Sequence, residues 1–303
     1  MTSTGSIPDR LLAACLLPSG LAVLWLVSKA RWFWSHNPEL KYGWVVLFLC
    51  GYLFWEAWEK KPAPRWEWTG GNIATGLLGF TVLFLTQLYQ AALGLTPASM
   101  IGLGTGVLMV IIANLNYVFG RGGVRHFGFA AAFILLSLPP PALLYNPTVS
   151  QLQSAVAAIN VEVLNLSGVA AHRAGSVIQL PACTVGVDEA CSGIRSLQSA
   201  IMATLFIGYL TLRRNSFRAL LFLSGIALAV AGNLARSLFL SFIANASGVE
   251  AIHAYHDAAG WSILMFTAIG VALFSWRLNK LETSLAKQNS DAPAAESPPS
   301  QPA

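Results

Sequence analysis

Eight long stretches of apolar residues constrain the fold of this chain more than any other feature of its sequence. An α-helix needs roughly 20 mostly apolar residues to cross the hydrocarbon core of a bilayer. Eight stretches approach that length: 11–28, 43–58, 73–93, 98–119, 127–145, 192–212, 217–245 and 260–276. Because 55% of the residues are hydrophobic and only 10% are charged, a soluble protein would expose too much apolar surface. The sequence therefore predicts an all-α polytopic membrane protein with about eight transmembrane helices.

Short clusters of lysine and arginine between these stretches indicate how the chain is oriented, since cytoplasmic loops are enriched in both residues. Four clusters fall on one side if eight spans alternate: Lys60, Lys61 and Arg65; Arg121 and Arg125; Arg213, Arg214 and Arg218; Arg277, Lys280 and Lys287. This predicts a multi-pass protein with both termini in the cytoplasm, although Lys29, Arg31 and Lys41 would then lie outside. The net charge of +5 is thereby explained by topology, and nucleic acid is not an expected partner.

The longest connection, from about 146 to 191, would lie outside the cytoplasm and begins with an amphipathic pattern. Residues 149–166 place apolar side chains, among them Ile159 and Leu166, at helical spacing opposite polar ones such as Asn160. The pattern predicts a helix that lies at the membrane interface.

The rest of this connection, and the end of the chain, have different patterns. The stretches 176–180 and 183–187 alternate β-prone residues around Pro181 and predict a small extracytoplasmic β-hairpin. From about residue 283 the chain is rich in Ala, Pro, Ser and Gln, which cannot bury a core. The expected organisation is a transmembrane domain over 1–282 and a disordered cytoplasmic tail over 283–303.

Cys191 stands where a polar segment gives way to the sixth apolar stretch. It should lie at a helix N-terminus, where unpaired backbone N–H groups and the positive end of the helix dipole favour an anion. The thiolate form of Cys191 is therefore expected to be stabilised relative to that of an ordinary cysteine. Ser192 and Gly193 add little bulk and leave room for a substrate backbone. Two other interpretations are a helix-cap cysteine without function and a disulfide to Cys183.

Asn233 and Arg236 share one face of the seventh predicted span. Arg236 lies 19 residues beyond Phe217. That separation is roughly 28 Å along a helix, which brings Arg236 to the external end of the span. An arginine in a span usually marks function, but one near a helix end can also simply extend to the headgroups.

His253 and His256 fall between the last two predicted spans, on the same external side. No further histidine or cysteine at ligand spacing accompanies them in the sequence, so neither a metal nor another cofactor is expected. His256 is better used as a general base for Cys191, because histidine titrates near neutral pH and can return the proton to a leaving amine. The alternative is that both histidines only meet headgroups and water.

Three separate segments thus deliver Cys191, Arg236 and His256 to one membrane face. Such a set supports acyl transfer, in which the thiolate attacks a peptide carbonyl, Arg236 stabilises the oxyanion and His256 shuttles the proton. A transporter with a polar pathway lined by Arg236 and His256 is the alternative from another class. A third hypothesis is a non-enzymatic assembly factor for an exported polymer, with Cys183 and Cys191 joined in a disulfide.

Three motifs resemble those of the exosortase and archaeosortase family of membrane-embedded cysteine transpeptidases. They are A-C-S-G-I-R-S-L at 190–197, N-L-A-R at 233–236 and H-D-A-A-G-W at 256–261, and Tyr42–Val46 and the prolines at 139–141 are similar as well. The resemblance implies that Cys191, Arg236 and His256 are catalytic. The residues expected to support these three are Asn233, Ser192, Gly193, Arg195 and Asp257. Either Asn233 or Asp257 could orient the histidine or the arginine, and the sequence leaves this open.

The same resemblance implies a location and a substrate. The protein is expected in the cell inner membrane, surrounded by lipid, with its active site on the extracytoplasmic side. Its partners would be exported proteins with a C-terminal sorting signal of the PEP-CTERM type, made of a short motif, an apolar span and a basic tail. Cleavage near the motif would form a thioester with Cys191 that an amine or water later resolves.

Overall fold

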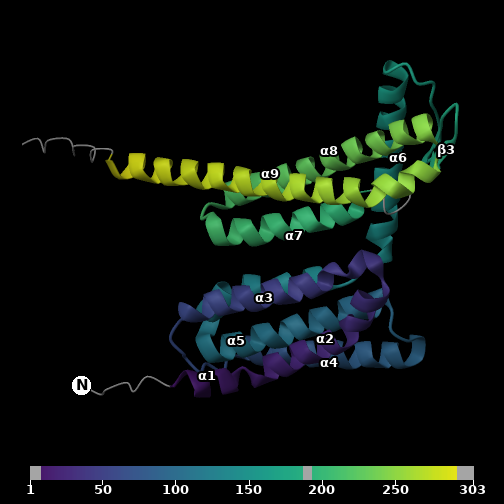
Figure 1. Cartoon of the computed structure of the whole chain (residues 1–303). Coiled ribbons are helices and arrows are strands. Elements are labelled where there is room, and N and C mark those ends of the chain that lie inside the picture. The colour runs from purple at the N-terminus through teal and green to yellow at the C-terminus, as the bar shows by residue number, and fades with distance from the viewer. Residues whose placement is uncertain (1–7, 187–192, 292–303) are drawn as a thin grey trace, which may run out of the picture. The chain divides into compact units, whose positions relative to one another are not determined.

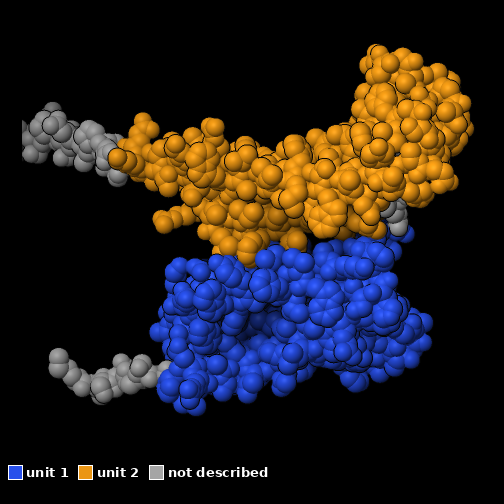
Figure 2. Space-filling view, viewed as in Figure 1, with its two compact units in different colours: residues 1–148 blue, residues 149–303 orange. Residues whose placement is uncertain are grey.

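The computed structural model describes residues 8–186 and 193–291, with side chains described up to residue 288. The chain forms two compact units, residues 1–148 (unit 1) and 149–303 (unit 2), which Figure 2 shows in different colours. Helices make up most of each unit, and unit 2 adds a small sheet (Figure 1).

Unit 1 consists of helices joined by short connections (Figure 1). In chain order they are α1 (Asp9–Cys15), α2 (Leu17–His36), the 3₁₀ helix η1 (Pro38–Leu40), α3 (Tyr42–Glu59), α4 (Gly70–Leu93), α5 (Pro97–Phe133) and the 3₁₀ helix η2 (Ile134–Ser137). The bounds of α3 and α4 agree closely with the predicted second and third spans. The first predicted span is instead a bent pair, since α1 and α2 meet at 55°. Pro18 lies in the first turn of α2, where its missing N–H costs no helical hydrogen bond.

Helix α5 doubles back at Gly120. The backbone there has φ 68° and ψ −168°, which glycine adopts without the strain that a side chain would bring. Gly104, near the start of α5, packs against side chains that follow its end, because a Cβ added there would lie 3.2 Å from Leu135 and would overlap Leu138. A straight helix would separate Gly104 from Leu138 by roughly 50 Å. The predicted spans 98–119 and 127–145 are therefore two arms of one helical hairpin, and the second arm ends early, at Ser137.

Trp34 organises the packing among α2, α3 and η2. Its ring is buried, and its Nε1 donates a hydrogen bond to Ser137 O at 2.7 Å. Gly43 lets α3 approach this ring, because a Cβ at that position would overlap the indole. The Tyr42–Val46 segment thus has a packing role in unit 1.

Unit 2 begins within α6 and ends with three long helices. Its elements are α6 (Ala142–Leu166, whose first residues belong to unit 1), β1 (His172–Ala174), β2 (Val177–Gln179), β3 (Thr184–Gly186), α7 (Ile194–Thr211), α8 (Asn215–Ser247) and α9 (Glu250–Asp291). The strands form an antiparallel sheet in the order β1-β2-β3, with Ile178 opposite Val185. The predicted hairpin is confirmed as β2 and β3. Strand β1 was not predicted, because its three exposed residues carry no apolar alternation.

Helix α6 and the sheet pack against the last turns of α8 and form a cap on unit 2 (Figure 1). Asn160 of α6 is buried and donates from Nδ2 to Ser237 Oγ of α8 at 2.7 Å. Ile159 and Leu166, in contrast, are exposed. The apolar face expected from the sequence is therefore divided: Val156 packs into the core of unit 2, whereas Ile159 and Leu166 stay open. The open part fits the predicted place of α6 at the membrane interface.

Four helices among the described residues are long and apolar enough to cross a membrane, and a fifth joins them if the bent pair α1–α2 counts as one span. Helices α3 and α7 are not among these four. Arg195 and Gln198 make the first turns of α7 polar, and Glu56 and Glu59 have the same effect at the end of α3. The structure agrees with an all-α membrane protein, whereas the count of eight spans stays a prediction.

Helix α9 continues to Asp291, so residues 283–291 are helical although the sequence predicts a tail from about 283. The remaining residues of the predicted tail, 292–303, lie outside the described part of the chain. Just before this segment, the buried carboxylate of Glu282 accepts the backbone N–H groups of Arg213 at 2.9 Å and Arg214 at 2.6 Å. Glu282 thereby fixes α9 to the start of α8, where helical N–H groups lack helical partners.

Candidate active site

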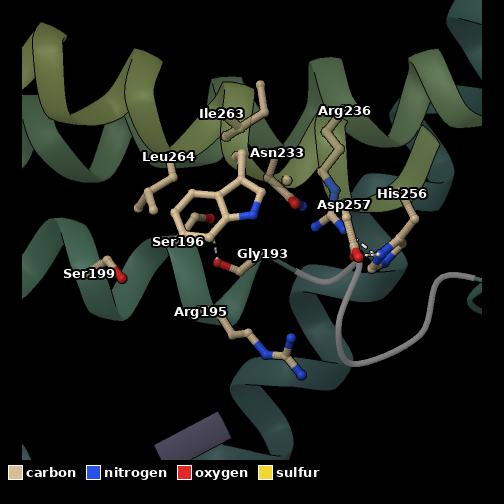
Figure 3. A pocket seen from close by; sticks show the side chains of 12 residues that line it. Gly193, Arg195, Ser196, Ser199, Asn233, Arg236, His256, Asp257, Ile263 and Leu264 are labelled. Atoms are coloured by element: carbon tan, nitrogen blue, oxygen red, sulfur yellow. Dashed lines mark hydrogen bonds and ion pairs between the residues drawn. The ribbon is translucent and has the colours of Figure 1, made fainter. Parts of the chain in front are cut away.

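A cleft of about 320 Å³ lies among α7, α8 and α9 in unit 2 (Figure 3). Helix α7 lines it with Ser196 and Ser199, α8 with Asn233 and Arg236, and α9 with residues from His256 to Leu264. The sequence motifs at 190–197, 233–236 and 256–261 therefore all contribute residues to one cleft.

The start of α9 brings His256 to Arg236. The sequence suggested that the histidines lie in a connection between spans, but the structure makes this segment helical from Glu250. The chain reverses at Gly248, whose φ of 84° suits a residue without a side chain. Glu250 in the first turn is favourable at the positive end of the helix dipole. As a result, His256 lies one turn before Gly260, which packs against the Arg236 guanidinium.

Arg236, His256 and Asp257 form a hydrogen-bonded chain (Figure 3). Arg236 Nη2 lies 2.8 Å from His256 Nε2, and His256 Nδ1 lies 3.1 Å from Asp257 Oδ1. A guanidinium group has only donors, so Nε2 must accept and the proton of the neutral ring sits on Nδ1, facing Asp257. The Asp257 side chain is 92% exposed, so solvent screens this second contact.

Asn233 contacts a different part of the cleft. Its side chain is 3% exposed and packs against Gly193, the residue before the first turn of α7. Gly193 has φ 83°, and an added Cβ would lie 2.6 Å from Asn233 Nδ2. Ser196 Oγ also donates to Gly193 O at 2.8 Å. The structure thus pairs Asp257 with the histidine and Asn233 with the turn that begins α7.

Cys191 and Ser192 lie outside the described residues. Helix α7 begins at Ile194, three positions after Cys191. Cys183 is a free thiol whose Sγ lies 3.5 Å from Ala244 O. Arg195 is exposed and points away from Arg236 and His256 in Figure 3.

The sequence did not predict the wall of this cleft. Trp261 of α9 lines it. Ile263 and Leu264 of the same helix and the hydroxyls of Ser196 and Ser199 complete this wall (Figure 3). Trp261 is 65% exposed and places an apolar ring beside these polar groups. Helical spacing from His256 could have placed these α9 residues on one face with it, but only if α9 is known to begin before His256.

The fold and this cluster define a helical membrane protein with a polar, histidine-containing cleft in its C-terminal helix bundle. The family model for transmembrane exosortases matches residues 34–274, which is most of the chain. The chain belongs to this family, as the resemblance of its motifs predicted. No curated protein and no solved structure matches the chain.

Proposed function

We propose that this exosortase is a cysteine protease and transpeptidase of the cell inner membrane that cleaves PEP-CTERM-like C-terminal sorting signals of exported proteins. The observation that carries the proposal is the chain from Arg236 through His256 to Asp257, in a cleft that also contains the start of the helix following Cys191. A thiol, a base and a fixed cationic donor are the groups that acyl transfer requires. In the predicted topology this cleft faces the extracytoplasmic side.

In this mechanism, the hydrogen bond between Arg236 and His256 is present before substrate binds. Nε2 is occupied by Arg236, so His256 cannot take a proton there until the guanidinium moves. A substrate carbonyl oxygen competes for the same donors, because it gains negative charge as the thiolate attacks. Arg236 would therefore turn from the imidazole to the carbonyl oxygen when the substrate binds, which frees Nε2 before the thiol loses its proton, and it would then stabilise the oxyanion.

The covalent steps then balance without a cofactor. Cys191 gives its proton to His256, and its sulfur attacks the carbonyl carbon of the scissile peptide bond. The C–N bond breaks as His256 protonates the leaving amine, which leaves the exported domain as a thioester on Cys191. An incoming amine or water gives a proton to His256, attacks the thioester carbon and releases the thiolate, which takes this proton back from His256 and restores the Cys191 thiol.

The shape of the cleft supports a substrate whose cleavage site is followed by an apolar segment. From Arg236 the cleft extends along α7 and α9 to Ser199 and Leu264 (Figure 3). Trp261 gives it an exposed apolar wall immediately beside the polar cluster. A sorting signal presents the same order, a polar motif and then a membrane span.

Replacement of Cys191 tests the proposal. Cys191→Ala is co-expressed with an exported protein that carries a sorting signal, and shortening of that protein is followed by immunoblot. The proposal expects full-length substrate to accumulate. Cys183→Ala is the matched control, because Cys183 is also a thiol on the same side in the predicted topology, and it should process normally. Normal processing by Cys191→Ala would refute the proposal.

A further inference from the structure

Unit 1 contains a second, chemically different cavity of about 540 Å³, enclosed by α1, α2, α3 and α5. Figure 2 shows that the surface of unit 1 is hollowed between its helices. Its wall is formed by apolar side chains: Val23 and Leu47 are half-buried, and Leu115 and Phe127 are buried core residues. The cavity therefore lies against the core of unit 1.

The bend between α1 and α2 helps to form this cavity and is held by specific hydrogen bonds. The break frees the carbonyl of Cys15, which accepts from Asn114 Nδ2 of α5 at 3.1 Å. Ser19 Oγ donates to Asn114 Oδ1 at 2.7 Å. Ala13, before the bend, and Ser19 and Gly20, after it, line the cavity. Asn114 thus fixes the two helices at the angle that keeps the space open.

We propose that this cavity binds the acyl chain of a membrane phospholipid. Water is a poor occupant, because a buried water needs two to four polar partners, and Ser19, the one hydroxyl among the described lining residues, already donates to Asn114. A transmembrane helix is too thick, since a cylinder of about 10 Å diameter would fill the volume with roughly one turn. A flexible hydrocarbon chain needs no polar partners and is thin enough to enter the cavity.

The ends of the cavity indicate which lipid reaches it. Trp58 lines the cavity near the end of α3, and Lys61 Nζ lies 5.1 Å from its ring centroid. Tryptophan and lysine gather at the level of lipid headgroups. Lys61 also pairs with Asp9 at 3.1 Å, so charge alone does not select the headgroup. The geometry points to a phospholipid of the leaflet beside Trp58, whose tail passes between α2 and α3 toward Leu115.

Two glycines in the wall make the proposal testable without steric damage. A Cβ added at Gly20 or Gly51 would have no atom within 4 Å, and both positions lie in helices where leucine is the better helix former. Gly20→Leu and Gly51→Leu therefore fill the cavity from two sides. Gly122→Leu is the matched control, because Gly122 also has open space but does not line the cavity.

The full-length variants are reconstituted in phospholipid vesicles with a trace of phosphatidylglycerol that carries a diazirine in its acyl chain. After irradiation, cross-links are mapped by mass spectrometry. Wild type should label Val23 and Leu47, two half-buried lining residues, and Gly20→Leu and Gly51→Leu should each reduce this labelling about tenfold, equivalent to roughly 1.4 kcal/mol. Labelling of Phe84, an exposed residue of α4, should not change and controls for folding.

Two outcomes would overturn the lipid site. They are label confined to exposed residues such as Phe84, and unchanged cavity labelling in both leucine variants. Neither of them bears on sorting-signal processing, so the lipid site and the proposed function stand or fall separately.

Discussion

The two units differ in the polar groups that meet between their helices. In unit 1 the polar groups described above are uncharged and hold helices in place: Thr96 caps α5, Asn114 holds the bend between α1 and α2, and the Ser137 carbonyl accepts from the Trp34 ring. In unit 2, polar side chains of separate helices meet one another, as Arg236 of α8 meets His256 of α9. Unit 1 accordingly contains an apolar cavity, whereas unit 2 contains a polar cleft.

This difference indicates that the polar groups of the two units have different roles. Polar groups that meet inside a membrane protein are costly and usually have a functional reason. Polar groups that cap or bend helices need no such reason, since they satisfy backbone groups that the helix geometry leaves open. We therefore expect substitutions of the charged cluster in the unit 2 cleft to affect processing, and substitutions of the helix-capping and helix-bending residues in unit 1 to affect stability alone.

The largest effect is expected at the contact between Arg236 and His256. Arg236→Ala and His256→Ala should each lower the processing rate by about 10²- to 10⁴-fold, the range observed for general bases and oxyanion donors. Processing is measured as the rate of substrate shortening at equal enzyme levels. His253→Ala is the control, because His253 lies one turn earlier on the exposed side of α9. Equal losses of processing rate in all three variants would show that the substitutions act by destabilising the helices and not by removing catalytic groups.

A smaller effect is expected at Gly193. Gly193→Ala brings both a strained backbone and a clash with Asn233, which together should lower the free energy of unfolding by roughly 2–4 kcal/mol. Gly248→Ala also strains the backbone, because φ 84° with ψ 168° is a conformation that only glycine adopts readily, but the added methyl has open space. It should therefore lose the backbone part alone, about 1–3 kcal/mol. Thermal unfolding in detergent measures the difference. Equal losses would show that Asn233 tolerates the methyl group.

Glu282 tests whether buried charge in unit 2 also serves architecture. Glu282→Gln keeps the shape of the side chain but weakens its bonds to Arg213 and Arg214, at a cost of about 1.5–3 kcal/mol for hydrogen bonds to a charged group. Thermal unfolding is again the measurement. Glu250→Gln, an exposed position on the same helix, should cost less. A larger loss at Glu250 would contradict the assigned role of Glu282.

The smallest effect is expected in unit 1. Thr96→Ala removes the side-chain cap of α5, whose Oγ1 accepts from Ser99 N at 3.2 Å, and should cost about 1 kcal/mol. The processing rate should stay at the wild-type level. Thr81→Ala, at an exposed mid-helix position, is the control and should be nearly neutral. A clear loss of processing in Thr96→Ala would contradict the expectation that such substitutions in unit 1 affect stability alone.

Local patterns were sufficient for much of the fold. The bounds of α3, α4 and α8 follow from long apolar runs, and the β2–β3 hairpin follows from alternation around Pro181. Local patterns were insufficient where contacts between distant segments determine the start of a helix or its buried face. The start of α9 lies among polar residues that hydropathy excludes from a span. The buried face of α6 depends on Ser237 of α8, a partner far away in the sequence.

The candidate site shows the same limit. The motifs identified Arg236 and His256, and the structure brings them into contact. Motif spacing could not show that Arg236 occupies Nε2 of His256, because that contact depends on how α8 and α9 pack. The partners of Asp257 and Asn233 were left open for the same reason, and the Trp261 wall was not predicted.

We propose that unit 2 performs acyl transfer through a thioester on Cys191, and mass spectrometry of the protein after incubation with a sorting-signal substrate tests this directly. The proposed mechanism predicts an adduct of the exported domain on the peptide containing Cys191 that neutral hydroxylamine removes. This adduct should be present in Cys183→Ala and absent from Cys191→Ala. Substrate cleavage with an adduct on another residue, or cleavage by Cys191→Ala at the wild-type rate, would contradict it.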